Sequence, residues 1–303
     1  MKIVVAGGTG FLGRPLTARL VSGGHEVVVL TRGRGGAGPG VRAMVWTPDG
    51  GDGAWAGEID GADAVINLAG ESIAGHRWSA EHKQRVLDSR VRATRSLVAA
   101  IARALQPPAV FASGSAVGYY GPRGDEVVTE DTPSGGDFLA RVCVQWEAEA
   151  ARAIGPRTRV VCIRTGLVLE RDGGALPQML PPFRFGAGGP VGSGRQYWPW
   201  IHRADWIEIV RWAIETSTVS GPINATAPEP VTNAEFARAL GRALRRPAFM
   251  PAPAFALRLM LGEMADALLL SGQRVVPAKA QLLGYVFKYA HLDDALAAIF
   301  GSR

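Results

Sequence analysis

Short apolar runs rich in β-branched residues alternate with amphipathic stretches along the first half of the chain. Runs that are apolar throughout are typical of parallel strands buried on both faces. They lie at Ile3–Ala6, Val27–Leu30, Ala64–Leu68, Val110–Ser113 and Arg159–Ile163. The stretches between them predict helices over Arg14–Gly23, Ser79–Leu105 and Cys143–Ala153. This alternation predicts an α/β fold, a Rossmann-like doubly wound parallel sheet with right-handed crossovers.

The regular alternation ends near Gly173, where prolines and glycines indicate irregular connections. Further on, the pattern becomes helical, with helices expected over Asn233–Leu244, Ala254–Leu270 and Leu292–Phe300. We therefore expect a Rossmann domain over residues 1–225 and a smaller, mainly helical C-terminal lobe over residues 226–303. Residues 174–203 are expected to contribute to that second lobe, which would lie on the substrate side.

Composition narrows the class of protein. A chain of 303 residues with 47% hydrophobic and 20% charged residues fits a globular protein with a sizeable core. The net charge is +6, but the arginines are scattered, and no helix-turn-helix or aromatic–basic alternation favours nucleic acid. The chain has no apolar run of about 18 residues and no signal peptide, so we expect a cytoplasmic protein without a membrane span. Cys143 and Cys162 are expected to be buried thiols.

A Gly-rich turn follows the first predicted strand and precedes the first predicted helix. Gly7, Gly10 and Gly13 are spaced three residues apart. One glycine permits a tight turn, another lets the backbone approach a pyrophosphate, and the third lets helix and strand pack closely. The N–H groups at the helix start then face the phosphates. Any turn can need glycine, but this context predicts a dinucleotide site formed by Gly7, Thr9, Gly10, Phe11, Leu12 and Gly13.

The end of the second predicted strand bears on the choice between NAD and NADP. An NAD-selective fold places an acidic residue there, which binds the ribose 2′-OH. This strand instead ends in Thr31 and Arg32, a hydroxyl and a fixed cation that suit a 2′-phosphate. Arg34 is a further candidate. The alternative is that Arg32 is an ordinary surface arginine. We expect the cofactor to be NADP(H).

Several further motifs carry a family resemblance. They include Asn67–Glu71, Arg77-Trp78, Ser113–Gly121, Gly135–Phe138, Arg164–Leu169, Gly188–Gly194, Pro199–His202, Thr232–Phe236 and Gly272–Pro277. Together with the turn, the chain resembles the extended or atypical branch of the short-chain dehydrogenase/reductase superfamily. Within that branch it is similar to the NADP-binding "epimerase family" subgroup with a C-terminal domain of unknown function. This resemblance implies an oxidoreductase or epimerase-like protein, monomeric or homodimeric, with a small-molecule substrate such as a sugar nucleotide or a carbonyl compound.

The resemblance also implies cofactor contacts beyond the turn. Thr31 and Arg32 match contacts to the adenosine phosphate, and Arg90 matches an arginine on the long helix that reaches the cofactor phosphates. The remaining matching positions lie at strand ends: Leu68, Ala69, Gly70, Glu71 and Val168. Core packing is the alternative for Leu68, Ala69 and Val168, and a solvated helix face is the alternative for Arg90.

The catalytic group that the resemblance implies is incomplete. Such enzymes carry a Ser, and a Tyr four residues before a Lys on one helix. The helix predicted over Phe138–Ala150 contains neither Tyr nor Lys, and alignment on Glu147 places Leu139 and Cys143 at their positions. A serine is retained as Ser113 or Ser115. Tyr119 and Tyr120 are candidates for the missing proton donor, with aromatic packing over the cofactor as the alternative.

Other polar or aromatic groups are expected at the carboxyl edge of the sheet, where open α/β folds bind ligands. They are Glu71 as a general base, His202 as a group titrating near neutral pH, and Arg77 and Trp200. The histidines and cysteines show no metal-ligand spacing. Two hypotheses remain open: an NADP(H)-dependent oxidoreductase or epimerase with a nonstandard proton donor, and a non-catalytic NADP(H)-binding sensor or scaffold.

Overall fold

The computed structural model describes residues 1–33, 38–51 and 53–301, so Arg34 lies outside the described residues. Its centre is a parallel seven-stranded sheet with the strand order β11-β7-β5-β4-β1-β2-β3. The strands are β1 (Lys2–Ala6), β2 (Glu26–Thr31), β3 (Val41–Val45), β4 (Ala64–Asn67), β5 (Val110–Ala116), β7 (Arg159–Thr165) and β11 (Gly221–Ala225). This order confirms the predicted Rossmann-like, doubly wound α/β fold.

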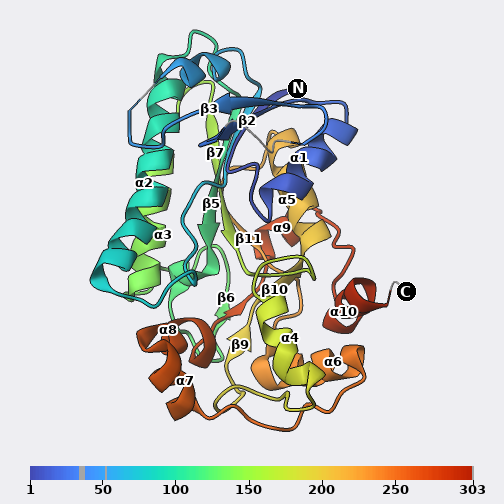
Figure 1. Ribbon diagram of the computed structural model, residues 1–303. Helices are drawn as coiled ribbons and strands as arrows, with labels where there is room; N and C mark the ends of the chain where they lie inside the picture. The colour runs from blue at the N-terminus through green and yellow to red at the C-terminus, as the bar shows by residue number, and fades with distance from the viewer. Residues whose placement is uncertain (34–37, 52, 302–303) are drawn as a thin grey trace.

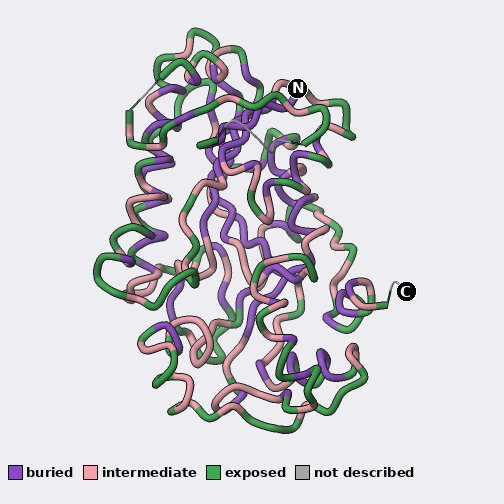
Figure 2. Tube along the Cα trace, in the orientation of Figure 1, coloured by how far each residue is buried: buried purple, intermediate pink, exposed green. Residues whose placement is uncertain are grey.

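Helices cover both faces of the sheet (Figure 1). Helices α1 (Gly13–Ser22) and α5 (Arg203–Glu215) lie on one face, and α2 (Ala80–Arg103) and α3 (Phe138–Ala151) on the other. Side chains alternate between the two faces along β1, since Val5 packs in the α1–α5 core and Val4 in the α2–α3 core. Figure 2 shows this buried interior as the purple centre of the trace. None of the described helices is long and apolar enough to cross a membrane.

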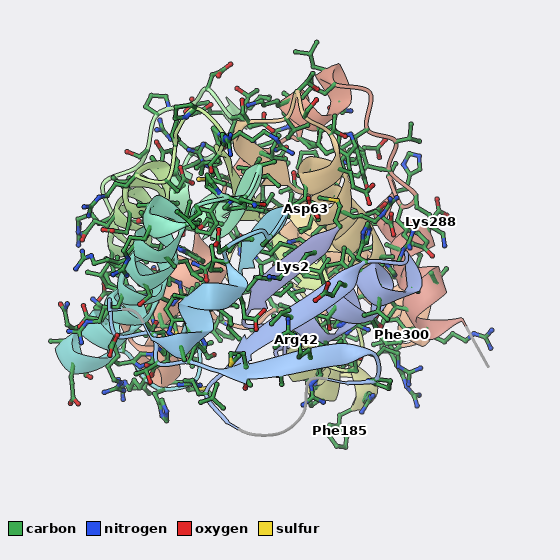
Figure 3. All side chains as sticks on the ribbon, turned by 90° about the horizontal axis from the view of Figure 1, so that it is seen from above. Lys2, Arg42, Asp63, Phe185, Lys288 and Phe300 are labelled. Carbon is green, nitrogen blue, oxygen red and sulfur yellow. The ribbon has the colours of Figure 1, made fainter. Side chains whose placement is uncertain are left out.

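Three elements of this domain were not predicted from the sequence. Strand β3 lies at the sheet edge and is largely exposed, so it has no continuous apolar run. Arg42 lies on this edge (Figure 3) and forms an ion pair with Glu58. Helix α5 and strand β11 follow the proline-rich segment, where we expected the alternation to end; they continue it and add the last strand of the sheet.

The C-terminal lobe has its own core, formed by α4 (Leu176–Arg184), α6 (Asn233–Leu244) and α10 (Leu292–Phe300). Three short strand pairs connect this lobe to the main domain: β6 (Val127–Val128) with β13 (Arg274–Val275), β8 (Leu167–Leu169) with β10 (Trp200–His202), and β9 (Tyr197–Trp198) with β12 (Val231–Thr232). Helix α9 (Ala278–Leu282), also in this lobe, packs against β11. The lobe is smaller and mainly helical, as predicted. At the end of α4, Phe185 is 88% exposed and points away from the protein (Figure 3).

The prediction of a single helix over Ala254–Leu270 is wrong. The structure divides it into α7 (Ala254–Leu261), α8 (Glu263–Ala265) and a π-helical turn over Asp266–Leu270. The break falls at Gly262, whose φ of +63° lies in the left-handed region that glycine adopts at little cost. The apolar periodicity continues across this break, and for this reason the sequence pattern predicts one continuous helix.

Candidate cofactor and substrate site

The Gly-rich turn between β1 and α1 is tightly closed. Gly7 has a φ of +79°, and the Gly10 amide donates to the Gly7 carbonyl oxygen at 3.1 Å. A Cβ atom on Gly13 would lie 2.2 Å from the Gly7 carbonyl oxygen and 2.6 Å from the Gly8 Cα. Two of the three glycines are therefore required by backbone geometry, Gly7 by its φ and Gly13 by the close approach of helix and turn.

The start of α1 presents free backbone donors. Among the described residues, the amides of Phe11, Leu12 and Gly13 have no hydrogen-bond acceptor. No side chain caps α1, and its first turn holds no acidic residue. A ten-residue helix with three open N–H groups and a favourable dipole suits a phosphate. The turn therefore fits the pyrophosphate of a dinucleotide.

The end of β4 closes one side of this turn. A Cβ on Gly7 would lie 2.7 Å from the Leu68 carbonyl carbon and oxygen and 2.9 Å from the Ala69 amide nitrogen. The Ala69 amide donates to Asn67 Oδ1, and Asn67 Nδ2 donates to Thr94 Oγ1 on α2. The predicted strand-end residues Leu68 and Ala69 thus lie directly against the predicted phosphate turn.

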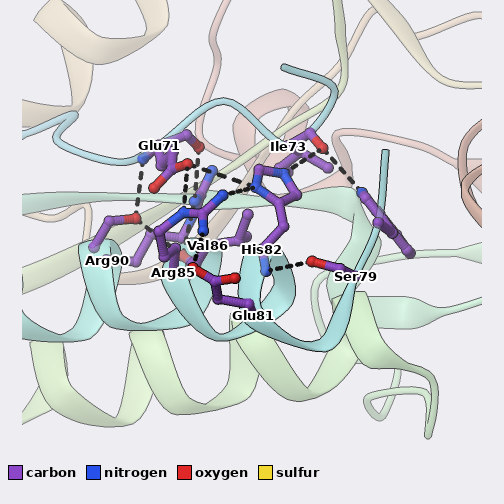
Figure 4. A network of polar contacts seen from close by, with 10 residues as sticks. Glu71, Ile73, Ser79, Glu81, His82, Arg85, Val86 and Arg90 are labelled. Carbon is purple, nitrogen blue, oxygen red and sulfur yellow. Dashed lines mark hydrogen bonds and ion pairs between the residues drawn. The ribbon is translucent and has the colours of Figure 1, made fainter. Parts of the chain in front are cut away.

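The loop after β4 is fastened to α2 through Glu71 (Figure 4). The Glu71 amide donates to Ser89 Oγ at 2.9 Å, and the Glu71 carbonyl accepts from Arg90 Nη1 at 3.0 Å. The Glu71 carboxylate pairs with Arg85 at 3.3 Å and lies 3.5 Å from Nδ1 of the buried His82. These contacts place Glu71 in a clamp that holds the loop.

Arg90 lies under this loop and is only 9% exposed. Its Nη1 donates to the Glu71 and Val86 carbonyls, and the guanidinium lies over the Trp146 ring at 5.2 Å. Burial lowers the pKa of Arg90, and no described carboxylate lies within ion-pair distance of it. A buried cation with unused N–H donors beside Gly70 can accept an anionic group of a ligand.

At the end of β2, Thr31 and Arg32 differ in exposure. Thr31 is 8% exposed, and its Oγ1 accepts a long hydrogen bond of 3.4 Å from the Gly33 amide. Arg32 is exposed and forms no ion pair with any described residue. Arg32 is therefore available to a ligand phosphate near the turn.

Phe11, Leu12, Leu68 and Val168 share one hydrophobic cluster with the α1–α5 core. Phe11 packs against the backbone after β8, because a Cβ on Gly173 would lie 2.4 Å from its ring. Val168 is 7% exposed and pairs with Ile201 across β8 and β10. The structure thus brings Val168, from the second half of the domain, beside the turn.

The two retained serines lie in different environments on β5. Ser113 is fully buried, and its Oγ donates to the neighbouring Gly114 carbonyl at 3.2 Å. Ser115 Oγ donates to Glu147 Oε1 on α3 at 2.6 Å. Cys143 lies beside Ser115, and burial raises the pKa of its thiol to about 11. Cys143 is therefore a neutral thiol near neutral pH.

An ion pair that sequence reasoning missed holds the Ser115 partner in place. Arg164 on β7 donates from Nε and Nη2 to the two Glu147 oxygens at 2.8 and 2.9 Å. The side chains of Arg164 and Glu147 are only 4% and 13% exposed. Arg164 directly follows the apolar run Val160–Ile163 in β7, and a charged residue at the end of such a buried run is the sequence signal for this ion pair.

The two tyrosines after β5 have different roles in packing. Tyr119 is half-buried, and the Arg164 guanidinium stacks on its ring at 3.5 Å. Its hydroxyl has no hydrogen-bond partner among the described residues. Tyr120 is fully buried, donates to Asn224 Oδ1 at 2.6 Å and accepts from Arg164 Nη1 at 2.9 Å. Burial raises the pKa of Tyr120 to about 12, so Tyr120 belongs to the core and only Tyr119 faces outward.

The other sheet-edge groups have structural contacts. His202 caps α5, since its Nδ1 accepts from the Ala204 amide, and burial lowers its pKa. Trp200 Nε1 donates to the Glu229 carbonyl. Arg77 lies near Gly262, at the break between α7 and α8. No group of three metal-binding side chains is found in the part of the chain that the structure describes.

Comparisons with known proteins bear out the resemblance. The NAD dependent epimerase/dehydratase family matches residues 3–225, and a domain of unknown function (DUF1731) matches residues 252–299. The human epimerase family protein SDR39U1 is 41% identical over 302 residues, which span 99% of both chains. A crystal structure of human SDR39U1 (isoform 2) with NADPH has a TM-score of 0.91 at 40% identity and full coverage of both chains. A nucleoside-diphosphate sugar epimerase from Corynebacterium glutamicum has a TM-score of 0.81 at 36% identity, covering 99% of this chain and 58% of that one.

Proposed function

The chain belongs to the NAD dependent epimerase/dehydratase family, and from that premise we propose that it is an NADP(H)-dependent oxidoreductase or epimerase acting on a small molecule. One observation carries the proposal: the tight turn presents three amide N–H groups that no described residue accepts, and Arg32, which pairs with no described residue, lies at the next strand end. The NADPH in the human SDR39U1 structure supports this choice of cofactor. The similar Corynebacterium glutamicum protein favours a nucleoside-diphosphate sugar as the substrate class, with other carbonyl compounds as the alternative.

Each predicted cofactor contact has a role in this proposal. The Phe11, Leu12 and Gly13 amides bind the pyrophosphate, and Thr9 and Gly10 line the turn. Thr31 and Arg32 bind the 2′-phosphate, and Arg90 binds a further anionic group beside Gly70 and Glu71. The apolar residues Leu68, Ala69 and Val168 line the remaining surface and exclude water. NADP(H), when bound, supplies or accepts the hydride.

Replacing Arg32 tests cofactor selectivity. Arg32→Ala removes the cation assigned to the 2′-phosphate but leaves the turn intact, because Arg32 is exposed and makes no ion pair with the described residues. A lost charge-assisted contact of about 2 kcal/mol weakens NADPH binding about 30-fold and leaves NADH binding nearly unchanged. Fluorescence titration of both cofactors measures this ratio. Arg19→Ala, which removes a half-buried α1 arginine paired with Glu208, is the control and should preserve it. If Arg32→Ala weakened the binding of NADPH and NADH equally, the assignment of Arg32 to the 2′-phosphate would be wrong.

For catalysis we assign Ser115 and Tyr119. The Ser115 hydroxyl donates its hydrogen bond to Glu147, so the Ser115 oxygen can accept a hydrogen bond from a substrate hydroxyl. Tyr119 lies four residues further along the chain with a hydroxyl that no described residue contacts, and it moves the proton that accompanies the hydride. Ser113 is fully buried and fits this role less well.

Serine variants test this assignment. In an assay with NADP⁺ and UDP-glucose, extended to other nucleotide sugars and carbonyl compounds, Ser115→Ala is expected to lower kcat about 30-fold. Tyr119→Phe should lower kcat by about 100-fold or more, as loss of a proton-transfer group does. Ser113→Ala is the matched control and should stay within about threefold. A larger effect of Ser113→Ala than of Ser115→Ala would reverse the assignment. Tight NADPH binding with no turnover of any compound would instead favour the sensor hypothesis.

We place the NADP(H) domain at residues 1–225, with residues 174–203 contributing to the second lobe, and the substrate-side domain at residues 226–303. The two family matches, 3–225 and 252–299, support a division near residue 225. We also propose a cytoplasmic monomer or homodimer. Sedimentation equilibrium distinguishes the two assembly states.

A further inference from the structure

A hollow of about 520 Å³ opens on the C-terminal lobe, and its volume falls in the range of small-molecule sites. Four of its lining residues are the arginines Arg238, Arg242, Arg245 and Arg246, and none of its lining residues is acidic; the others are Gly241, Ala248 and Phe249. All of these residues belong to α6 or to the segment directly after it. Figure 1 shows α6 at the lower end of the molecule, away from α1 and the Gly-rich turn.

The charge of this hollow is only partly compensated by the described residues. Arg242 forms a bidentate pair with Asp293 on α10, with both distances at 2.8 Å. Arg238, Arg245 and Arg246 form no ion pair or side-chain hydrogen bond with any described residue. Their guanidinium groups repel one another across a hollow without a carboxylate. A bound anion would remove this repulsion.

The backbone around the hollow contains one close contact and one strained residue. The chain folds back over α6 at Gly241, where a Cβ would lie 2.6 Å from the Ala248 Cβ. This fold brings Phe249, which is 74% exposed, to the rim. Arg245 ends α6 with a φ of +54°, the only positive φ among the described residues other than glycine. Glycine is the common residue at such a helix end, and strained positions that keep a functional side chain often mark binding sites.

We propose that this hollow binds a diphosphate-bearing small molecule. Arg238, Arg245 and Arg246 surround the phosphate oxygens, because guanidinium groups match phosphate geometry bidentately. Three cations that pair with no described residue match the two to three negative charges of a diphosphate better than the single charge of a carboxylate. Phe249 offers a flat apolar surface to the organic part of the ligand. This site is independent of the Gly-rich turn and of the proposed NADP(H) function.

Calorimetric titration at about 0.15 M salt tests the proposal, because nonspecific surface attraction is screened there. The probes are inorganic pyrophosphate and ADP, and the variant is Arg245→Ala/Arg246→Ala. Both probes should lose at least about tenfold in affinity at the hollow, while NADPH binding stays unchanged. The control Arg92→Ala/Arg103→Ala removes two arginines of α2 and should leave pyrophosphate binding as in the parent. Unchanged binding of both probes to Arg245→Ala/Arg246→Ala would overturn the proposal.

Two single variants sharpen the result. Phe249→Ala should weaken ADP more than pyrophosphate if the ligand is a nucleotide, and both equally if it is a free diphosphate. Arg245→Gly should weaken pyrophosphate binding and raise the melting temperature by about 2 °C, since glycine relieves the positive φ. A variant that gains stability and keeps full affinity would show that Arg245 serves no ligand.

Discussion

Gly13→Ala is expected to weaken NADPH binding by at least about 100-fold, a loss of about 2.7 kcal/mol of binding free energy. The new methyl group would lie 2.2 Å from the Gly7 carbonyl oxygen and 2.6 Å from the Gly8 Cα. Both neighbours are backbone, so the turn must open, and the amides of Phe11 and Leu12 then lose their alignment with the phosphates. Fluorescence titration of NADPH measures the loss, and circular dichroism shows whether the variant is folded.

Two alanine substitutions at other glycines are the controls for this result. A Cβ on Gly57 would meet no atom within 4 Å, so Gly57→Ala should bind NADPH as the parent does. A Cβ on Gly10 would lie 3.4 Å from the Gly7 carbonyl oxygen, an ordinary van der Waals contact, so Gly10→Ala should weaken NADPH binding much less than Gly13→Ala. A folded Gly13→Ala protein with parental affinity would contradict the assignment of the turn to the cofactor.

Glu147→Gln is expected to lower the free energy of unfolding by about 3–5 kcal/mol, because it leaves the buried Arg164 charge without its partner. Burial alone would lower the pKa of Arg164, but its hydrogen bonds to Glu147 raise that pKa above the usual value. Arg164 also stacks on Tyr119 and donates to Tyr120, so its displacement would disturb both rings. Urea denaturation at neutral pH measures the change.

A double-mutant cycle separates the pair from its surroundings. Glu147→Gln/Arg164→Met removes both charges, and it should recover part of the stability lost by Glu147→Gln alone. Asp88→Asn breaks the exposed pair with Arg92 and should cost no more than about 0.5 kcal/mol. A Glu147→Gln variant as mild as Asp88→Asn would show that water reaches the Arg164 pair.

Much of the nucleotide-binding half was predictable, because its signals are local. A parallel strand buried on both faces needs a continuous apolar run, as in β1 and β2. The turn needs glycine at Gly7 because of its positive φ and at Gly13 because of its close contact with Gly7 and Gly8, and both reasons act between residues near in the sequence. The edge strand β3 gave no such signal, because solvent covers most of it.

The sequence by itself thus determined the Rossmann-like sheet, the position of the turn and the charge of Arg32 beside it, since each depends on short-range spacing and side-chain chemistry. Only the tertiary structure decided that Ser115, Glu147 and Arg164 meet, because they come from β5, α3 and β7. It also decided that Tyr120 is buried while Tyr119 faces outward. Adjacent tyrosines with the same chemistry differ only in the residues that pack around them. Local periodicity in the sequence does not predict packing between distant segments.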